Sequence, residues 1–442
     1  MTIETPTKSQ TPATPTASPA ADASTAPAHV LGMRCRACGR PEEIGPNYVC
    51  AGCFGPLEVV YDFDVARRAL TREAIAQRQP GIWRYLELLP VSAAPARGLA
   101  VGSTALVPAD RLGAQIDVDR LWLKDDTRNP TLSFKDRVVA VAAARAVEFG
   151  FDTLACASTG NLAGATAAAS AALGLRAFVF VPSDLEPAKV DHALGYGATV
   201  VRVDGTYDDI NRLSLEIADE EGWAFVNVNL RPFYSEGSKT LAFEIAEQLG
   251  WRLPDVLVSP IASGSLFTKV AKGFDELIAI GLVEAKEVRF VGGQPEGCSP
   301  VATAFAAGTD RIEPVRRPDT IVRSLAIGSP ADGPYALDLV RRTGGSIEAI
   351  PDVDTAATIR RLAAAEGIFV ETAGGVTLAA VEAARRRGVI RDGDEVVALL
   401  TGNGVKTPDA RRFGLSEADG EIEGAAPPIA ATFEAFSARY GS

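Results

Sequence analysis

Histidine is scarce in this chain, which has only His29 and His192 among its 442 residues. A Ser-His-Asp triad needs a histidine base, and a His-rich metal site needs several imidazole ligands. The scarcity disfavours both kinds of site. If the chain is an enzyme, a residue of another type must move protons.

Long apolar runs and an excess of positive charge are also lacking. No stretch of about 18 uncharged apolar residues, the length needed to span a bilayer, occurs. The N-terminus has no cationic start followed by an apolar stretch, as a secretory signal would have. The formal net charge of −12 opposes contact with a nucleic-acid phosphate backbone. We therefore expect a cytoplasmic protein with neither a membrane nor a nucleic acid as partner.

Two nucleotide-binding motifs are missing. The segment EGSKT at residues 236–240 does not fit the Gly-x4-Gly-Lys-Ser/Thr pattern that holds nucleoside triphosphates. No Gly-x-Gly-x-x-Gly follows a first strand, so a dinucleotide is not indicated either.

Four of the six cysteines form two Cys-x-x-Cys pairs. They are Cys35, Cys38, Cys50 and Cys53. Two such pairs supply the tetrahedral set of thiolates that Zn²⁺ prefers in a structural site. We therefore predict structural zinc here, with metal-free knuckles or a disulfide pair as the alternatives.

The composition changes along the chain in a way that indicates its organisation. Residues 1–28 are rich in Thr, Pro, Ala and Ser and predict a disordered tail, and residues 29–60 form the expected zinc-ribbon-like module. The rest alternates short apolar runs with amphipathic stretches, as in α/β proteins with parallel sheets. We expect a large lobe from residues 61–150 and 227–442 and a small α/β lobe from 151–226. Ligands of such sheets bind beyond the carboxyl ends of the strands.

The expected strands and helices can be placed by residue. Strands are predicted over 152–158, 175–181, 198–203, 255–261, 287–293 and 395–402, and helices beginning near 161, 186 and 207 and spanning 65–77.

Lys135 stands where a polar loop, LSFKDR, opens an alanine-rich helix. A lysine is unusual there, because the positive end of the helix macrodipole disfavours a second positive charge. An amine in such a place can form an imine with an aldehyde. The alternative is a solvated surface lysine paired with Asp136.

Three other loops could bind a ligand. The loop at 158–161, STGN, can hold a carboxylate or phosphate, and its Asn161 can bond a ring hydroxyl; the alternative is an ordinary Ser/Thr helix cap. The loop at 262–266, ASGSL, also suits a phosphate. At a third strand end, close after the segment ETAGG that begins at Glu371, Thr401 could reach a ring nitrogen.

Taken in order, NPTLSFKDR, STGN, SGSL, ETAGG and TGNG resemble the motif series of fold type II pyridoxal phosphate enzymes, the tryptophan synthase β family. The opening CRACGR…YVCAGCFGPLEVVYD, with NVNLRPFYSEGSKT and SLAIGSPADG, is similar to threonine synthases that carry an N-terminal zinc-ribbon-like module. The resemblance runs from about residue 31 to 411. It implies a two-lobed α/β fold with parallel-sheet lobes, the large one binding the cofactor.

The resemblance also implies roles for individual residues. Lys135 is the catalytic residue and forms the Schiff base with the cofactor. The cofactor's 3-hydroxyl is bound by Asn161, its ring nitrogen faces Thr401, and its phosphate is held by Ala262, Ser263, Gly264, Ser265 and Leu266. The expected substrate ligands are Ser158, Thr159 and Gly160 for the carboxylate and Lys124, Asn229 and Arg231 for a phosphate, with Arg231 favoured for its bidentate fork.

The implied reaction converts O-phospho-L-homoserine and water into L-threonine and phosphate, and the implied assembly is a homodimer. The loop ASGSL departs from the asparagine- and glycine-rich phosphate loop of many threonine synthases. Cysteate synthase and a threonine or serine dehydratase are the alternatives within the fold. An interaction protein with a zinc ribbon on an inactive scaffold is the alternative of another class, and the acidic charge opposes a nucleic-acid role for it.

Overall fold

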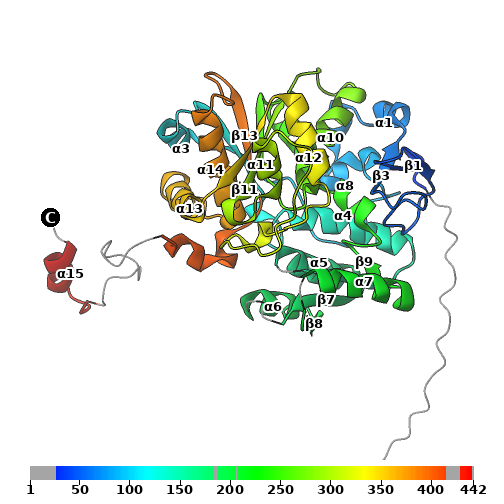
Figure 1. Ribbon diagram of the computed structural model, residues 1–442, viewed down its shortest axis with the longest axis horizontal. Coiled ribbons are helices and arrows are strands. Elements are labelled where there is room, and N and C mark those ends of the chain that lie inside the picture. Colours follow the sequence, from blue (N-terminus) through cyan, green and yellow to red (C-terminus); the bar gives the residue numbers. More distant parts are fainter. Residues whose placement is uncertain are drawn as a thin grey trace, which may run out of the picture.

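The computed structural model describes residues 26–158, 160–183, 185, 187–205, 207–414 and 429–440. Within these ranges two largely parallel sheets and a small antiparallel sheet are present (Figure 1). Most of the predicted tail, residues 1–25, lies outside the described residues. In the described part, every helix is too short or too polar to cross a membrane.

The larger sheet has the strand order β12-β11-β10-β13-β5-β4. All neighbouring strands in it are parallel except β4 and β5, which pair antiparallel. Its central strand β10 is wholly buried, because helices cover both faces. The strands are β4 Leu106–Pro108, β5 Arg120–Asp125, β10 Val256–Pro260, β11 Arg289–Pro295, β12 Ser346–Ile350 and β13 Glu395–Leu400.

The smaller sheet is parallel throughout, with the order β8-β7-β6-β9. It lies below the larger sheet in Figure 1. Its strands are β6 Thr153–Ala157, β7 Arg176–Pro182, β8 Thr199–Val203 and β9 Ala224–Phe225, and its connections contain α5 Asn161–Leu173, α6 Pro187–Leu194 and α7 Tyr207–Glu221. The six strands and the three helix starts predicted from the sequence are confirmed to within two residues.

Helices fill the connections of the larger sheet. They are α3 Asp110–Gln115, α4 Lys135–Glu148, α8 Arg231–Glu236, α9 Lys239–Gln248, α10 Ser265–Ala279, α11 Pro300–Ala306, α12 Gly333–Thr343, α13 Asp352–Glu366 and α14 Thr372–Arg386, with α15 Phe433–Tyr440 near the C-terminus. Helix α14 packs against β10, β11, β12 and β13. Two apolar cores, one of them containing Phe267 and Phe290 and the other Val258 and Val381, hold the helices to the sheet.

The single helix predicted over 65–77 is wrong, because two helices occupy that segment: α1 Phe63–Ala69 and α2 Arg72–Gln77. Leu70 ends the first with φ −106° and ψ 82°, which are not helical angles. The Thr71 hydroxyl then accepts the N–H of Ala74 and caps the second.

The cysteine module forms a three-stranded antiparallel sheet from β1 Val30–Cys35, β2 Pro41–Glu42 and β3 Leu57–Tyr61. Buried charges attach it to the helices. Lys269 of α10 donates to Glu58 and to Glu236, both at 2.6 Å. The hydroxyl of Tyr61 donates to Glu236 at 2.8 Å. Since each of these groups has a partner, the module is joined to the rest of the protein by a satisfied polar network.

Glu58 should make this attachment sensitive to acid. Burial would raise the pKa of its carboxyl, but the ammonium groups of Lys269 and Lys272 outweigh burial and lower the pKa to about 2. A carboxyl whose pKa is lowered in the folded state adds stability above its unfolded value, near 4.5, and loses it as pH falls through 2. We expect Glu58→Gln to reduce the free energy of unfolding by about 2 kcal/mol at pH 7.

Urea unfolding of both proteins at pH 7 and at pH 2.5 to 3, roughly within the titration range of Glu58, measures this difference. The gap between wild type and Glu58→Gln should shrink as the pH falls. A gap that stays constant with pH would show that the charge of Glu58 does not stabilise the attachment.

Candidate functional site

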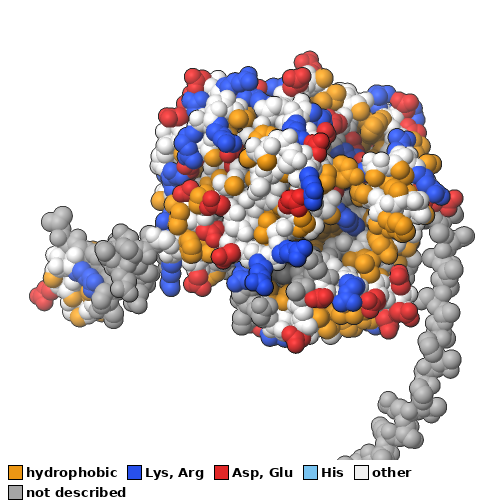
Figure 2. All heavy atoms as spheres, viewed as in Figure 1, with side chains coloured by type: hydrophobic (Ala, Val, Ile, Leu, Met, Phe, Trp, Pro, Cys, Tyr) orange, Lys and Arg blue, Asp and Glu red, His pale blue; other side chains and the backbone are white. Residues whose placement is uncertain are grey.

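The loops that were expected to bind a ligand meet at the carboxyl ends of the strands. Ser133 bridges to Gly402 and Val370 bridges to Asn403, so the segments before α4 and α14 both pair with the loop after β13. The N–H of Phe134 also donates to the carbonyl of Thr401 at 2.9 Å. Parallel strands end at one edge of a sheet, and these contacts bring distant motifs together there. Figure 2 shows a hollow on this molecule with basic side chains in it.

Lys135 is the first residue of α4, as predicted. Its Nζ donates to the hydroxyl of Tyr234 at 2.9 Å and lies 4.7 Å from the centre of the Phe134 ring. Asp136 is turned elsewhere, since its carboxylate accepts the N–H and the hydroxyl of Thr131, both at 2.7 Å. The amine is therefore half-buried beside aromatic rings, and the alternative of a surface lysine paired with Asp136 is not what the structure shows.

Asn161, the first residue of α5, is held at both ends of its amide. Its Nδ2 donates to Glu371 at 2.8 Å, and its Oδ1 accepts from Lys406 at 2.9 Å. Burial raises the pKa of Glu371 and lowers the pKa of Lys406. Both pKa shifts favour the neutral forms of the side chains. The attraction between the two opposite charges and, for Glu371, the hydrogen bond from Asn161 act against these shifts.

Gly402 makes room for Glu371. A Cβ at this glycine would lie 2.4 Å from the carboxyl carbon of Glu371, which is far inside van der Waals contact. The Thr-Gly turn after β13 is therefore needed for the position of the carboxylate that holds Asn161.

The loop at 262–266, which was expected to bind a phosphate, turns tightly before α10. Gly264 has φ +95°, a conformation that favours glycine, and a Cβ there would lie 2.8 Å from the backbone of Asp332. The N–H of Asp332 donates to the carbonyl of Ser263 at 2.8 Å. Helix α10 begins at Ser265, and its N-cap residue makes no side-chain cap. Its first N–H groups are thus suited to an anion.

A buried hydroxyl near Lys135 also fits a ligand. The Oγ of Ser133 is fully buried and lacks a hydrogen-bond partner among the residues that the structure describes. A buried polar atom of this kind usually has a partner in the complete protein. Together with the N–H groups at the start of α10, this hydroxyl fits a polar cofactor.

The loop after β6 is only partly described, because Thr159 lies outside the described residues. The hydroxyl of Ser158 accepts the N–H of Gly160 at 3.1 Å and the N–H of Ala163 at 3.0 Å. Ser158 thus accepts hydrogen bonds from the loop and from the first turn of α5. This is the Ser/Thr helix cap that was the alternative to a ligand site.

Two residues expected to bind a substrate phosphate have structural roles instead. The ammonium of Lys124 is fully buried and donates to Thr104, Glu244 and Gln248, which uses its three N–H groups. The amide of Asn229 accepts from Phe225 and donates to Trp223 within its own loop. We therefore correct the expectation that Lys124 and Asn229 bind the substrate. Arg231 stays partly exposed and pairs with Asp332 at 2.8 Å.

Three site residues were not predicted from the sequence. Tyr234 contacts Lys135, and Lys406 and Glu371 hold Asn161. Glu371 was part of the quoted segment ETAGG, and Lys406 follows TGNG by two residues. The only signal in the sequence was a lysine and a glutamate beside such motifs. Their common partner Asn161 is 245 residues from the lysine and 210 from the glutamate.

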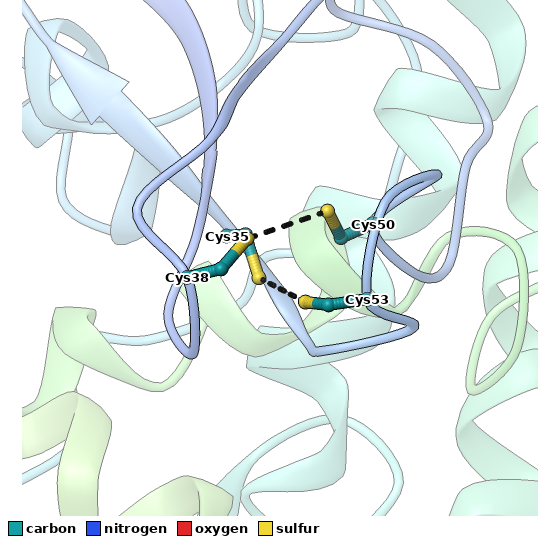
Figure 3. A group of neighbouring side chains, drawn as sticks. All are labelled: Cys35, Cys38, Cys50 and Cys53. Atoms are coloured by element: carbon teal, nitrogen blue, oxygen red, sulfur yellow. Dashed lines mark hydrogen bonds between the residues drawn. The ribbon is translucent and has the colours of Figure 1, made fainter.

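The four cysteines of the module lie in one cluster, with their sulfur atoms within 4.8 Å of one another (Figure 3). The distance is 3.5 Å between Cys35 and Cys53 and 3.8 Å between Cys38 and Cys50. Four sulfurs around a tetrahedral Zn²⁺, each about 2.3 Å from the metal, are about 3.8 Å apart. The donor set and its spacing therefore fit zinc.

The family model for pyridoxal-phosphate dependent enzymes matches residues 98–402, which include the loops described above. The chain therefore belongs to the pyridoxal-phosphate dependent enzymes, and its fold is that of their fold type II. A fungal L-serine ammonia-lyase from Rhizomucor miehei shares this fold with a TM-score of 0.61 at 20% identity, over 71% of this chain and 99% of that one.

Threonine synthases are among the sequence relatives within that class. The threonine synthase of Methanocaldococcus jannaschii is 35% identical over 86% of this chain and 93% of its own length. That of Methanosarcina acetivorans is 35% identical over 85% of this chain and 92% of its own. The expected fold class and family are thus confirmed.

We predict that Gly402→Ala displaces Glu371 and frees the amide of Asn161. Turnover should fall at least about 10-fold, because overpacking in a fixed site moves the groups around it. The measurements are kcat and the visible absorption of the bound cofactor. Gly195→Ala is the control, since a Cβ there meets the carbonyl oxygens of Asp191 and His192 at 3.4 and 3.7 Å, which is ordinary contact. Equal turnover in the two variants would contradict the role of Gly402.

Proposed function

We propose that this protein is a threonine synthase, which converts O-phospho-L-homoserine and water into L-threonine and phosphate with pyridoxal phosphate as cofactor. The observation that carries the proposal is the half-buried amine of Lys135, placed by α4 among the motif loops of a chain 35% identical to threonine synthases over most of its length. An amine in such surroundings is suited to covalent catalysis.

The residues present fit the cofactor. Lys135 would hold it through Nζ, Asn161 would bind its 3-hydroxyl, and the loop from Ala262 to Leu266 would bind its phosphate at the start of α10. Thr401, a neutral hydroxyl, would face its ring nitrogen. When bound, the group supplies a conjugated ring that stabilises negative charge on substrate carbons.

Proton movements fall to Lys135. His29 bonds the carbonyl of Leu89, and His192 lies against Gly164, so neither imidazole takes part in the contacts of Lys135. The freed Lys135 amine would take the proton from the substrate's Cα and move protons at Cβ. The carbon-oxygen bond at Cγ then breaks with loss of phosphate, and water adds at Cβ. The Tyr234 hydroxyl, 2.9 Å from Nζ, orients that amine throughout.

The substrate ligands follow from the same loops. We propose that its carboxylate binds at residues 158–160, with the N–H groups at the start of α5. Arg231 is the candidate for the substrate phosphate, because a guanidinium can bind phosphate through two parallel hydrogen bonds. Lys124 uses its three N–H groups within the protein and Asn229 bonds within its own loop, so we place these two residues outside the site.

We further propose an arrangement of lobes, a metal and an assembly. Residues 61–150 with 227–442 form the large lobe and 151–226 the small one, with the ligands between them. Zinc binds the four cysteines, which supply a closed tetrahedral set of sulfurs. The protein is a cytoplasmic homodimer, as the resemblance implies.

We predict that Lys135→Ala keeps the fold and loses turnover by at least about 1,000-fold, because the side chain both holds the cofactor and moves the protons. The assay incubates each protein with O-phosphohomoserine and measures phosphate and threonine together. Lys286→Ala is the control, since Lys286 lies at the surface and pairs with Asp255. Borohydride should fix the cofactor to the wild type and to the control, but not to Lys135→Ala.

Phosphate released without threonine would contradict the proposed reaction. Cysteate made from phosphoserine and sulfite, or a 2-oxoacid made from threonine or serine, would then identify one of the sister activities. Near-full turnover in Lys135→Ala would overturn the role of the lysine.

The zinc proposal has its own test. We predict that the double variant Cys35→Ser and Cys38→Ser loses the zinc that elemental analysis finds in the wild type, because a serine hydroxyl is a poor ligand for Zn²⁺. The control is Cys298→Ser, at a buried cysteine outside the cluster. Unchanged metal content in the double variant, or a wild type free of zinc, would contradict the assignment.

A further inference from the structure

A cavity lies where the cysteine module meets α8, α10 and the segment before α12. The module contributes Arg36 and Tyr48 to its wall, α8 contributes Arg231, and α10 contributes Ser265 and Lys269. Asp332 completes the polar part of the wall. The cavity is thus lined by side chains from four separate parts of the chain. Three of these side chains, Arg36, Arg231 and Lys269, are cationic.

The charges of this wall are unequal. The guanidinium groups of Arg36 and Arg231 share one carboxylate, that of Asp332, at 3.2 and 2.8 Å. Lys269 is balanced by Glu58 and Glu236, both at 2.6 Å. Two arginines against one aspartate leave an excess of positive charge. Each guanidinium has five N–H donors, and Asp332 takes one from each.

The arginine of the module is held in place. The guanidinium carbon of Arg36 lies 3.8 Å from the centre of the Tyr335 ring, and only 18% of its side chain is exposed. Stacking on an aromatic ring fixes the plane of the guanidinium and directs its fork. A planar fork held in this way matches the oxygen atoms of a phosphate better than a flexible ammonium does.

The position of the cavity relates it to the reacting amine. Arg231 and Tyr234 are three residues apart on α8 and so share one face of that helix. Tyr234 contacts Nζ of Lys135, while Arg231 lines the cavity. Ser265, which also lines the cavity, begins the helix proposed to hold the cofactor phosphate. A substrate at Lys135 can therefore extend its far end toward the two arginines.

We propose that Arg36 and Arg231 together bind the phosphate monoester of the substrate, so that the cysteine module supplies a residue of the substrate site. This proposal rests on the proposed function and deepens it. A phosphate monoester is attracted by the net positive charge that the two arginines keep beside Asp332, and its oxygens can accept from their remaining N–H donors. The module is then a wall of the active site.

The test compares Arg36→Gln with wild type and with Arg40→Gln. Arg40 belongs to the same module but is 56% exposed and pairs with Glu42. Arg36→Gln should raise the KM for O-phosphohomoserine at least about 10-fold, because a charged hydrogen-bond pair is lost. It should change kcat much less and weaken competitive inhibition by inorganic phosphate to the same degree. Arg40→Gln should leave both constants near wild type.

One further measurement separates the substrate phosphate from the cofactor phosphate. Cofactor retention after desalting, followed by visible absorption, should be equal in Arg36→Gln and wild type. If the variant loses the cofactor and keeps its KM, the cavity serves the cofactor phosphate and the proposal is overturned. An unchanged KM together with unchanged inhibition by phosphate also overturns it.

The role of Arg36 can be tested even if the protein does not catalyse the proposed reaction. If the wild type makes no threonine, titration with inorganic phosphate or O-phosphoserine still measures the site, and weaker binding by Arg36→Gln supports it. If Arg36→Gln loses zinc or does not fold, Arg36→Lys decides, since it keeps the charge and lacks the fork. An intermediate KM in Arg36→Lys supports the proposal, and a wild-type KM overturns it.

Discussion

The attachment of the cysteine module to the helices depends on the ion pairs of one buried carboxylate, that of Glu236. Burial alone would raise its pKa, but the ammonium groups of Lys239, Lys269 and Lys272 outweigh burial and hold the pKa well below its usual range. Tyr61 of the module donates to the same carboxylate. Glu236 thus joins the cysteine module to α8, α9 and α10. Removing one member of such a network leaves an unbalanced buried charge, which is strongly destabilising.

A second buried network holds the helix that carries the Lys135 amine. Arg137, two residues after Lys135, pairs with Asp126 and Glu244 and is fully buried. Lys124 pairs with the same glutamate. These contacts fix the first turn of α4 to the end of β5 and to α9, so the reactive amine starts from a rigid helix. Sites built on rigid elements hold their geometry more closely than sites on free loops.

The sequence predicted those features that depend on local pattern. Parallel strands, the helix that begins at Lys135 and the cysteine cluster all follow from spacing and periodicity, and all are present. Features that depend on distant partners were missed or misread. In the sequence, Lys124 cannot be told apart from a lysine that binds a ligand. Only its burial beside Glu244 in the structure shows its role. Tyr234 meets an amine 99 residues away, and no local pattern in its own segment indicates that contact.

Helix α8 has six residues and places three of them at different tasks. Arg231 faces the cavity, Tyr234 meets the amine, and Glu236 binds the module. Each added or deleted residue rotates the remainder of an α-helix by about 100°. An insertion between Arg231 and Tyr234 would therefore rotate Tyr234 and Glu236 relative to Arg231, and the three side chains could no longer all reach their partners. Changes of chain length should therefore be excluded from α8.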